Sequence, residues 1–338
     1  MRLDSNQGRM MNVKTVGLAA LGILAVIVTG LLVVVFLIFP RVSAAPDMQV
    51  ERTAERVARG DYLFNHALAC VGCHTPVLEP RRFSGLPDTH QMAAGRYMGG
   101  PAEGFPADIY PPNLTPTALG GWTDGEIYRA IVSGVTRDGR PMFALMPYVF
   151  YKALDTEDAK ALVAYLRSLP PQPVTQPATT LPLPVRIAMR FVVADPAPEG
   201  LSAPRDELAQ GKYLAFAGAC FECHTKRNDR GEPVGAPFAG GNIFALPGGA
   251  IVRSANITPD EETGIGGWSK ESFIARFRSR TAASLNDVLP QPGDMDSEMP
   301  WSAYAGMTEA DLGALYTYLR TVSPVAAEVV TFEPPPAK

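Results

Sequence analysis

The sequence predicts an all-α protein in which two tandem helical domains with long Gly/Pro loops follow one N-terminal transmembrane helix. Three observations support this fold class. An uncharged apolar run lies near the N-terminus, several short motifs occur twice in the same order, and apolar residues near those motifs recur at helical spacing. The length of 338 residues accommodates two or three domains. With 30 basic against 34 acidic residues, the chain lacks the positive charge that nucleic-acid-binding proteins carry.

The first element is the run from Val16 to Phe39, which contains no charged side chain. As a helix it would be about 36 Å long, enough to cross a bilayer. Three basic residues and one acidic residue precede it, so residues 1–15 are predicted to be cytoplasmic and both domains to lie on the periplasmic side of the cell inner membrane. A cleaved signal peptide is the alternative, because residues 42–44 are small. The run exceeds the roughly 7–15 apolar residues of such peptides, which favours an uncleaved anchor at residues 16–39.

A duplication organises the rest of the chain. In each copy a Gly-x-Tyr-Leu segment leads into Cys-x-x-Cys-His, and the motifs Asn-x-Thr-Pro, Gly-Trp, Met-Pro and Tyr-Leu-Arg follow in the same order. The first series begins at Gly60 and the second at Gly211. Because the order is kept while the spacing drifts, the copies are one module with insertions and deletions in its loops. The sequence therefore predicts domains at residues 52–171 and 206–325.

Helical signals occur at matching places in the two copies. Thr123 and Glu126 have the spacing of a capping box, which predicts that a helix starts there, and its counterpart starts at Ser269. Near the end of each copy, apolar residues recur at steps of three and four, as expected for the buried face of a helix. These residues are Ala159, Leu162, Val163, Leu166 and Leu169 in the first copy and Leu312, Leu315, Tyr316 and Leu319 in the second. No alternating strand pattern of comparable length occurs, so each module is predicted to be all-α.

A Pro-rich segment at residues 172–205 joins the modules and is predicted to be a semi-rigid linker. Within it, the apolar stretch Val185–Val193 contains two arginines four residues apart. We favour a turn packed on one module here. A short amphipathic helix, lying between the modules or on the membrane, is the alternative. The tail at residues 326–338 is predicted to be disordered.

All four cysteines fall in Cys-x-x-Cys-His motifs, at residues 70–74 and 220–224. This spacing is the attachment signature of c-type haem. Two thiols on one helical turn can each form a thioether with a haem vinyl group, and the adjacent imidazole can reach the iron. A Cys₄ zinc site needs its pairs about 15–20 residues apart and a thioredoxin-like pair needs a βαβ setting, and the sequence offers neither. The sequence therefore predicts two covalently bound haem c groups, held by Cys70, Cys73, His74, Cys220, Cys223 and His224.

The second axial ligand of each iron is predicted to be methionine. After the linker the only histidine is His224, so the second module has no second imidazole to offer, and a Met thioether is the usual replacement. Met146 and Met299 occupy the same place in the repeated Met-Pro motif, and a following proline keeps a residue out of a helix. Other residues stay open as rivals, although Met307 aligns with Leu154 and is predicted to be a core position. The rivals are Met92, Met98, Met142, His66 and His90 in the first module and Met295 and Met307 in the second.

Two further sets of repeated residues have a structural and a haem-related interpretation. Asn113 and Asn256 begin the Asn-x-Thr-Pro motifs, which favour turns, while hydrogen bonding near a haem propionate is the alternative. Arg140 and Arg167 are predicted to lie on solvated faces, with propionate pairing as the alternative.

The motifs together resemble one protein family. The chain is similar over about residues 52–325 to the multihaem cytochrome c subunit of membrane-bound bacterial alcohol and aldehyde dehydrogenases, which is built from class I cytochrome c modules. The resemblance rests on the haem motif at 70–74, the segment 256–268, Asp138-Gly139-Arg140-Pro141, Met146-Pro147-Tyr148 and the Tyr-Leu-Arg endings. This chain departs from that family in having two haem motifs instead of three, and in having its anchor at the N-terminus.

These observations predict a membrane-anchored dihaem c-type cytochrome that is not itself an enzyme. It would transfer single electrons from a dehydrogenase subunit to a terminal oxidase or a soluble cytochrome. A dihaem cytochrome c peroxidase, with one iron open to peroxide, is the first alternative, and the distal methionine available in each module disfavours it. A haem subunit of an oxidase complex is the second alternative.

Overall fold

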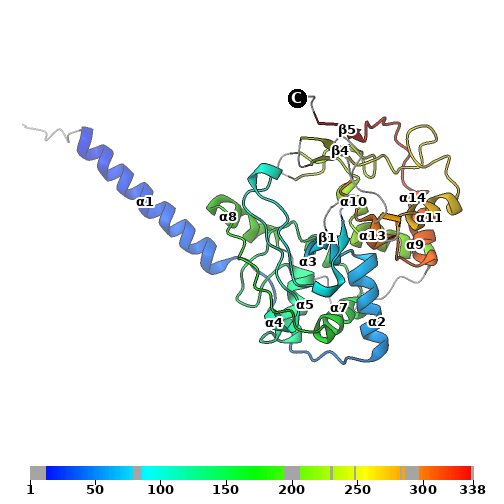
Figure 1. The fold of residues 1–338 in the computed structure, drawn as a ribbon. Coiled ribbons are helices and arrows are strands. Elements are labelled where there is room, and N and C mark those ends of the chain that lie inside the picture. Colours follow the sequence, from blue (N-terminus) through cyan, green and yellow to red (C-terminus); the bar gives the residue numbers. More distant parts are fainter. Residues whose placement is uncertain are drawn as a thin grey trace, which may run out of the picture.

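The computed structural model is mostly helical, which confirms the predicted predominance of helices (Figure 1). It describes residues 13–78, 85–193, 206–228, 231–246, 249–281, 284–285 and 297–335.

Helix α1 (Val13–Ile38) extends away from the rest of the molecule (Figure 1). It contains the predicted apolar run, and its segment Thr15–Ile38 is the one helix in the described residues that is long and apolar enough to cross a membrane. None of the apolar window of this segment is buried in the rest of the molecule, and its contacts with α8 are confined to its last turn, at Phe36. The apolar surface of α1 therefore needs an environment that the rest of the chain does not provide.

The first copy of the repeated motifs folds into a compact set of helices. α2 continues directly into the π-helical turn η1, and the capping box of Thr123 and Glu126 is present at the start of α5, as predicted. The helical elements are α2 (Ala54–Tyr62), η1 (Leu63–Ala67), α3 (Val71–His74), η2 (Thr89–Gln91), η3 (Pro101–Glu103), α4 (Pro116–Leu119), α5 (Asp124–Ser133), α6 (Tyr148–Tyr151) and α7 (Thr156–Ser168).

The second copy places helices at the matching motifs and in the same order. Ser269 caps the start of α11 by accepting a hydrogen bond from the backbone N–H of Ser272, as Thr123 does for α5. The helices are α9 (Glu207–Ala217), α10 (Cys220–Cys223), α11 (Lys270–Arg278), α13 (Trp301–Tyr304) and α14 (Glu309–Leu319), which correspond to α2, α3, α5, α6 and α7.

In each copy the first and last long helices cross at a glycine. A Cβ on Gly60 of α2 would lie 2.0 Å from the carbonyl oxygen of Ala161 in α7, and a Cβ on Gly211 of α9 would lie 1.9 Å from that of Ala314 in α14. Because a backbone carbonyl cannot move aside cheaply, only glycine allows this approach. The Gly-x-Tyr-Leu segment that precedes each haem motif therefore sets the helix crossing.

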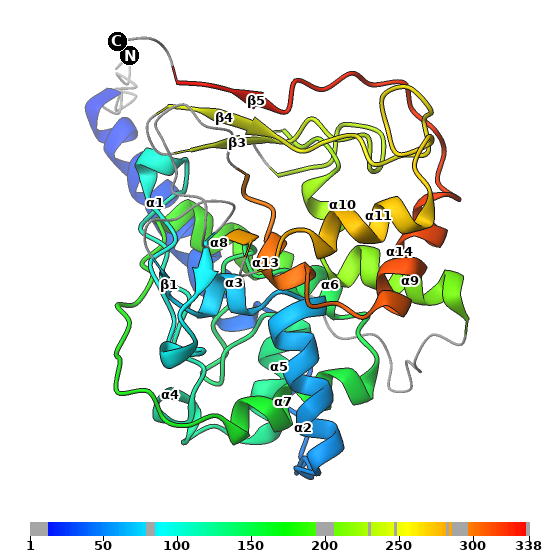
Figure 2. The same ribbon diagram turned by 45° about the vertical axis from the view of Figure 1, so that its right-hand side comes forward.

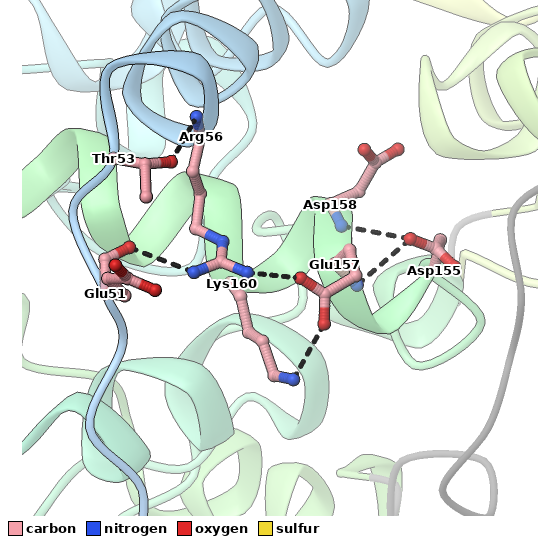
Figure 3. Close-up of polar contacts among 7 residues, drawn as sticks. All are labelled: Glu51, Thr53, Arg56, Asp155, Glu157, Asp158 and Lys160. Atoms are coloured by element: carbon pink, nitrogen blue, oxygen red, sulfur yellow. Dashed lines mark hydrogen bonds and ion pairs between the residues drawn. The ribbon is translucent and has the colours of Figure 1, made fainter.

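The α2–α7 crossing also has a polar edge, shown in Figure 3. Arg56 of α2 donates to the Glu157 carboxylate at 2.7 Å and to the carbonyl of Glu51 at 3.0 Å, and Lys160 reaches Glu157 from the other side at 2.8 Å. Asp155 caps α7 by accepting from the N–H groups of Glu157 and Asp158. The exposed ion pairs add little free energy, so the apolar packing below them holds the crossing together.

Short strands accompany the helices. β1 (Val77–Leu78) pairs antiparallel with β2 (Leu86–Pro87) beside the first haem motif. In the second module β3 (Ile243–Ala245), β4 (Ile251–Arg253) and β5 (Phe332–Glu333) form an antiparallel sheet in the order β3-β4-β5, with Ile251 opposite Glu333 (Figure 2).

The sheet corrects the prediction of a disordered tail over residues 326–338. Residues 326–335 run along the second module and end in β5, where Arg253 of β4 forms an ion pair with Glu333 at 2.9 Å. The backbone N–H of Ala327 donates to Thr263 at 3.0 Å. The tail is ordered because its backbone forms hydrogen bonds with the edge of β4. The residues of the tail themselves contain no local signal that predicts this pairing. Residues 336–338 lie outside the described residues.

The linker differs from its prediction in its second half. Residues 172–179 run along the first module, where Asn113 donates to the carbonyls of Gln172 and Val174, and Thr179 accepts from the backbone of Tyr110. The following residues form helix α8 (Leu183–Val192), beside the end of α1 (Figures 1 and 2). The favoured turn packed on one module is therefore wrong, and the amphipathic helix is present. Residues 194–205 lie outside the described residues.

One apolar core runs through both copies. It contains Leu63 and Phe64 of η1 together with Leu214 and Leu312 of the second copy. The aromatic ring of Phe150 in α6 lies 6.2 Å and 6.1 Å from the rings of Phe216 and Phe221. The two copies therefore pack directly on each other.

Two hydrogen bonds cross this interface reciprocally. Tyr62 at the end of α2 donates to Asp311 of α14 at 2.5 Å, and Tyr213 of α9 donates to Asp158 of α7 at 2.8 Å. The two tyrosines hold the same place in the repeated Gly-x-Tyr-Leu segments. Each module therefore supplies both a donor and an acceptor to a two-fold-like contact.

Candidate haem-attachment sites

Each Cys-x-x-Cys-His motif begins with a residue in the left-handed conformation. Ala69 has φ 49° and Ala219 has φ 60°, and each directly precedes the first cysteine of its motif. This conformation is uncommon for alanine, and here it ends η1 or α9 and turns the chain into the single helical turn of α3 or α10. The backbone N–H groups of His74 and His224 then donate to the carbonyls of Cys70 and Cys220, at 3.0 and 2.8 Å. The turn places both thiols and the imidazole of a motif close together.

None of the four cysteines forms a disulfide. Burial raises the pKa of Cys70, Cys220 and Cys223 to about 12 and raises that of Cys73. Each thiol is therefore neutral near pH 7. A thioether is also uncharged, so these positions accommodate sulfur bonded to haem carbon without the cost of a buried thiolate.

The two motif histidines are oriented for metal binding. Nδ1 of His74 lies 3.0 Å from the carbonyl oxygen of Pro112, and Nδ1 of His224 lies 2.7 Å from that of Ala255. A carbonyl only accepts hydrogen bonds, so Nδ1 carries the hydrogen and the lone pair resides on Nε2. Burial lowers the pKa of both imidazoles, which keeps them neutral. Backbone-held imidazoles of this kind are typical of metal-ligating histidines, and the donor set fits a haem iron.

A returning loop holds each histidine from behind. The backbone N–H groups of Gly95 and Gly240 donate to the carbonyls of His74 and His224, both at 2.7 Å. The two glycines have φ near +80°, and a Cβ on Gly95 would lie 2.5 Å from the carbonyl oxygen of Pro111. The position therefore requires glycine. The short motifs that identify the repeat do not include these glycines, because the number and the identity of the residues between each histidine and its glycine differ between the copies.

The Asn-x-Thr-Pro motifs form the predicted turns. The side-chain oxygen of Asn113 accepts from the backbone N–H of Thr115 at 2.8 Å, and that of Asn256 accepts from Thr258 at 3.0 Å. Both asparagines are buried and their amide groups donate to backbone carbonyls. Each turn follows the residue whose carbonyl holds the motif histidine, so the turn positions that carbonyl.

Met146 and Met299 occupy equivalent places. Each methionine is half-buried and packs against the common core. The carbonyl of Met146 accepts from Tyr148 N–H at 2.9 Å and that of Met299 accepts from Trp301 N–H at 2.7 Å, just before α6 and α13 begin. Their assignment as axial ligands stays a prediction.

The structure separates the rival ligands by their surroundings. Met307 is buried, with 1% of its surface exposed, which agrees with its predicted core position. His66 has its Nδ1 3.0 Å from the carbonyl of Ala303, so its ring faces the second module. His90 is exposed on η2. The sulfur of Met92 accepts from Thr75, the residue after His74. Met98 and Met142 enter backbone pairs with Ile109 and Gly134, and Met295 lies outside the described residues.

The prediction for Arg167 is wrong, because this side chain is not on a solvated face. It donates to the Asp124 carboxylate and to the carbonyls of Leu119 and Trp122, which ties α7 to the start of α5. Arg140 is exposed and forms an ion pair with Asp138, as the solvated-face prediction expects.

Two residues near the motifs were not predicted. Tyr151 and Tyr304 follow Met146 and Met299 at the same spacing, and the structure places both in the core. Burial, then the neighbouring Cys70, raises the pKa of Tyr151, and burial, then Cys220, raises that of Tyr304. The hydroxyl of Tyr304 donates to the carbonyl of Gly218 at 2.6 Å. Their identical offset from the Met-Pro motif was the signal in the sequence that could have found them.

The two motifs are also neighbours of each other. Burial raises the pKa of Cys223 first, and smaller contributions come from charges that include that of Cys73 in the other motif. Smaller contributions from Tyr304 and Cys73 also raise the pKa of Tyr151, and smaller contributions from cysteines of both motifs raise the pKa of Tyr304. The first cysteines of the two candidate sites, Cys70 and Cys220, also pack against the same apolar core, so the packing of the two copies brings the two candidate sites together.

Comparison with known proteins identifies relatives of this chain. Residues 57–170 match the family model of cytochrome c. The chain is 29% identical over 315 residues to the fructose dehydrogenase cytochrome subunit of Gluconobacter japonicus, covering 89% of this chain and 60% of the relative. It is 29% identical over 271 residues to the cytochrome c subunit of alcohol dehydrogenase (quinone) from Gluconacetobacter polyoxogenes, covering 76% and 54%. The chain thus spans little more than half the length of these relatives.

A third relative is a dihaem cytochrome. The chain is 29% identical over 204 residues to a dihaem c-type cytochrome of Cereibacter sphaeroides, covering 56% of this chain and 64% of the relative. Residues 57–170 are therefore a cytochrome c domain, which implies covalently bound haem c, and the relatives of the chain are electron-transfer subunits, not catalytic ones.

Proposed function

Because residues 57–170 form a cytochrome c domain, we propose that the protein is a membrane-anchored dihaem cytochrome c with two tandem class I domains, at 52–171 and 206–325. It transfers single electrons from a dehydrogenase subunit to a terminal oxidase or a soluble cytochrome. The observation that carries the proposal is the duplicated site: each Cys-x-x-Cys-His turn ends in an imidazole, buried at His74 and half-buried at His224, whose Nδ1 is held by a backbone carbonyl.

The residues of the chain divide the work of holding the haem groups. Cys70 and Cys73 would attach the first group and Cys220 and Cys223 the second, while His74 and His224 would bind the two irons through Nε2. Met146 and Met299 would complete the two coordination shells. Haem c, when bound, supplies an iron that takes up and gives back one electron.

The chain's own contribution is to hold each ligand in a fixed, uncharged state. The hydrogen bonds to Pro112 and Ala255 fix the tautomer and the ring orientation of the two histidines. Apolar side chains of the common core pack against Cys70 and Cys220. Rigid ligands in an apolar setting favour electron transfer, because little needs to rearrange when the charge of the site changes.

The partner and the compartment are supported by different observations. Similarity to cytochrome subunits of fructose and alcohol dehydrogenases supports a dehydrogenase as electron donor. The exposed apolar helix α1 supports anchoring in the cell inner membrane, and the basic residues before it support placing both domains on the periplasmic side.

The test uses the full-length protein purified in detergent. We expect two haem groups per chain, low-spin spectra at both irons, complete reduction by two electrons per chain, and no turnover of peroxide. One high-spin haem that reacts with peroxide would replace this proposal by a dihaem peroxidase. A single haem per chain would refute the second haem domain.

A further inference from the structure

Helix α8 has an apolar face that the described part of the chain leaves largely exposed. None of its ten residues is buried. Leu183, Phe191 and Val192 expose 48%, 56% and 37% of their surface. At about 100° per residue these three side chains, together with Pro184 and Ala188, lie on one half of the helix. Exposed apolar faces of this kind mark contacts with a partner or a membrane.

α8 is attached to the end of α1 by its two arginines and by Phe191, which still exposes 56% of its surface. The guanidinium groups of Arg186 and Arg190 lie 5.7 and 4.2 Å from the centroid of the Phe36 ring, and the ring of Phe191 lies 4.7 Å from that of Phe39. Arg190 also donates to the carbonyl oxygens of Phe36 and Phe39. The last carbonyls of a helix have no partner within the helix, so Arg190 caps α1 from outside.

This attachment fixes the depth of α8 if α1 spans the bilayer, a premise taken from the proposed function. The last turn of a spanning helix lies at the boundary between acyl chains and headgroups. α8 is held against that turn and therefore lies at the same boundary. A short helix with apolar side chains on one face and arginines on the other matches helices that lie in the plane of the interface.

The charges at this place point to the same ligand. Arg41, with its guanidinium 5.0 Å from the Phe39 ring, joins Arg186 and Arg190 around the end of α1. Within the described residues none of these three arginines forms an ion pair with a carboxylate. Burial, then repulsion from Arg186, lowers the pKa of Arg190. A cluster of guanidinium groups at headgroup depth, without a carboxylate partner among the described residues, is complementary to phosphate.

We propose that α8 is a second membrane contact, which lies on the phospholipid surface with Phe191 and Val192 in the interfacial region and Arg41 and Arg186 at the lipid phosphates. The contact adds a second point of attachment beside α1. A single helix would leave the two domains free to rotate about it, whereas two contacts hold them in one orientation to the membrane.

The test places a nitroxide label on the full-length protein in nanodiscs of phosphatidylglycerol and phosphatidylcholine. Ala188→Cys puts the label on the exposed face of α8, and Val234→Cys puts a control label at an exposed site of the second module. We expect the label at 188 to be several-fold more accessible to oxygen and less accessible to a water-soluble nickel chelate than the label at 234. Adding Phe191→Asp to Ala188→Cys should remove most of this difference.

Two results separate the failure of this proposal from the failure of anchoring. If the wild-type chain stays with membranes after alkaline carbonate washing but the label at 188 is as exposed to nickel as that at 234, α8 does not contact lipid and the proposal is overturned. Protection that arises only after a purified dehydrogenase is added would overturn it as well, and would make α8 a protein-docking face. If the wild-type chain is washed off the membranes, α1 is no anchor and both proposals fall.

Discussion

The two modules hold their interface with the same geometry but with different charges. In the first module, Arg59 of α2 donates two hydrogen bonds to the Asp158 carboxylate, at 2.7 and 2.8 Å. The matching residue of the second module is Gln210 of α9, whose amide donates one hydrogen bond to Asp311 at 2.8 Å. Each aspartate also receives a tyrosine from the other module. Among the described residues the two contacts therefore share their geometry, but only Asp158 forms an ion pair with a cation.

The loops over the two sites show the same mixture of likeness and difference. After α7 the linker passes over the first site and its carbonyls at Gln172 and Val174 accept from Asn113. After α14 the tail passes over the second site and the carbonyl of Val325 accepts from Asn256. Two unrelated segments thus provide hydrogen-bond acceptors to the equivalent asparagines of the two modules, because a buried side-chain amide needs acceptors.

Removing one thiol should have the largest effect and should act on one module only. Cys70→Ala and Cys220→Ala each delete one of two thioether bonds at one site, so we expect the haem content to fall from two groups per chain to one. Haem staining after denaturing electrophoresis, with quantitation against protein, measures this. Val234→Ala, at an exposed site, should keep two groups. An unchanged haem content in both cysteine variants, or zinc in place of iron, would contradict the assignment.

Replacing the predicted axial methionines tests whether the two irons are equivalent. Met299→Ala and Met146→Ala should each open one iron, shift its spectrum from low-spin towards high-spin and let carbon monoxide bind, while the other iron is unchanged. The reduction potential of that site should fall by a part of the ~0.8 V that axial ligands cover. Optical spectra and a redox titration measure both effects.

The buried methionine of the second module provides the control. Met307→Leu should lower stability without changing either spectrum, because the side chain only packs in the core. The assignment of Met299 is wrong if Met295→Ala or Met307→Leu produces the spectral change instead.

The helix crossings should prove equally intolerant in both modules. Gly60→Ala and Gly211→Ala each push a Cβ into a backbone carbonyl, so we expect a loss of about 1–3 kcal/mol of unfolding free energy for each. Urea unfolding followed by circular dichroism measures it. Gly267→Ala, where the nearest atom to a Cβ is 3.7 Å away, is the matched control and should change stability little. A much smaller effect at one crossing would show that this module can reopen its helix pair.

The tyrosines of the interface should give the smallest and least symmetrical effect. Tyr62→Phe leaves Asp311 with the Gln210 amide alone, whereas Tyr213→Phe leaves Asp158 with both Arg59 bonds. We expect a loss of about 0.5–1.5 kcal/mol for Tyr62→Phe, and a smaller loss for Tyr213→Phe. Equal losses in urea unfolding would mean that the charge difference between the modules has no energetic consequence.

The pH dependence of stability sharpens this comparison. Burial and the hydrogen bond to Asp311 raise the pKa of Tyr62 to about 12, against an ordinary value of 10.0. The unfolded chain releases this proton first, so the contribution of Tyr62 is fully present below pH 10 and is lost as the pH rises to about 12. Tyr62→Phe should remove this part of the alkaline loss of stability. An unchanged alkaline profile in that variant would contradict the placement of the Tyr62 hydroxyl.

Much of the molecule is readable from the sequence alone, because its signals are local. The spacing of Cys70, Cys73 and His74 predicts haem attachment, since the covalent chemistry needs three groups on one helical turn. The capping box at Thr123 and the apolar run of α1 act within a few turns of a helix, and both were found where predicted. The cytochrome c family model matches residues 57–170, in the first module. The second module is predicted from the order of the repeated motifs.

Only the tertiary structure decides which distant groups meet. The carbonyls of Pro112 and Ala255 accept hydrogen bonds from the two motif histidines. Arg167 donates to Asp124 at the start of α5, and the tail pairs with β4 as a further strand. None of these contacts can be predicted from neighbouring residues, because each joins groups that are far apart in the sequence and depends on the path of the chain between them. The docking of α8 on α1 and the reciprocal tyrosine bonds are of the same kind. Spacing within a helical turn is written in the sequence, and contacts closed by long loops exist only once the whole chain has packed.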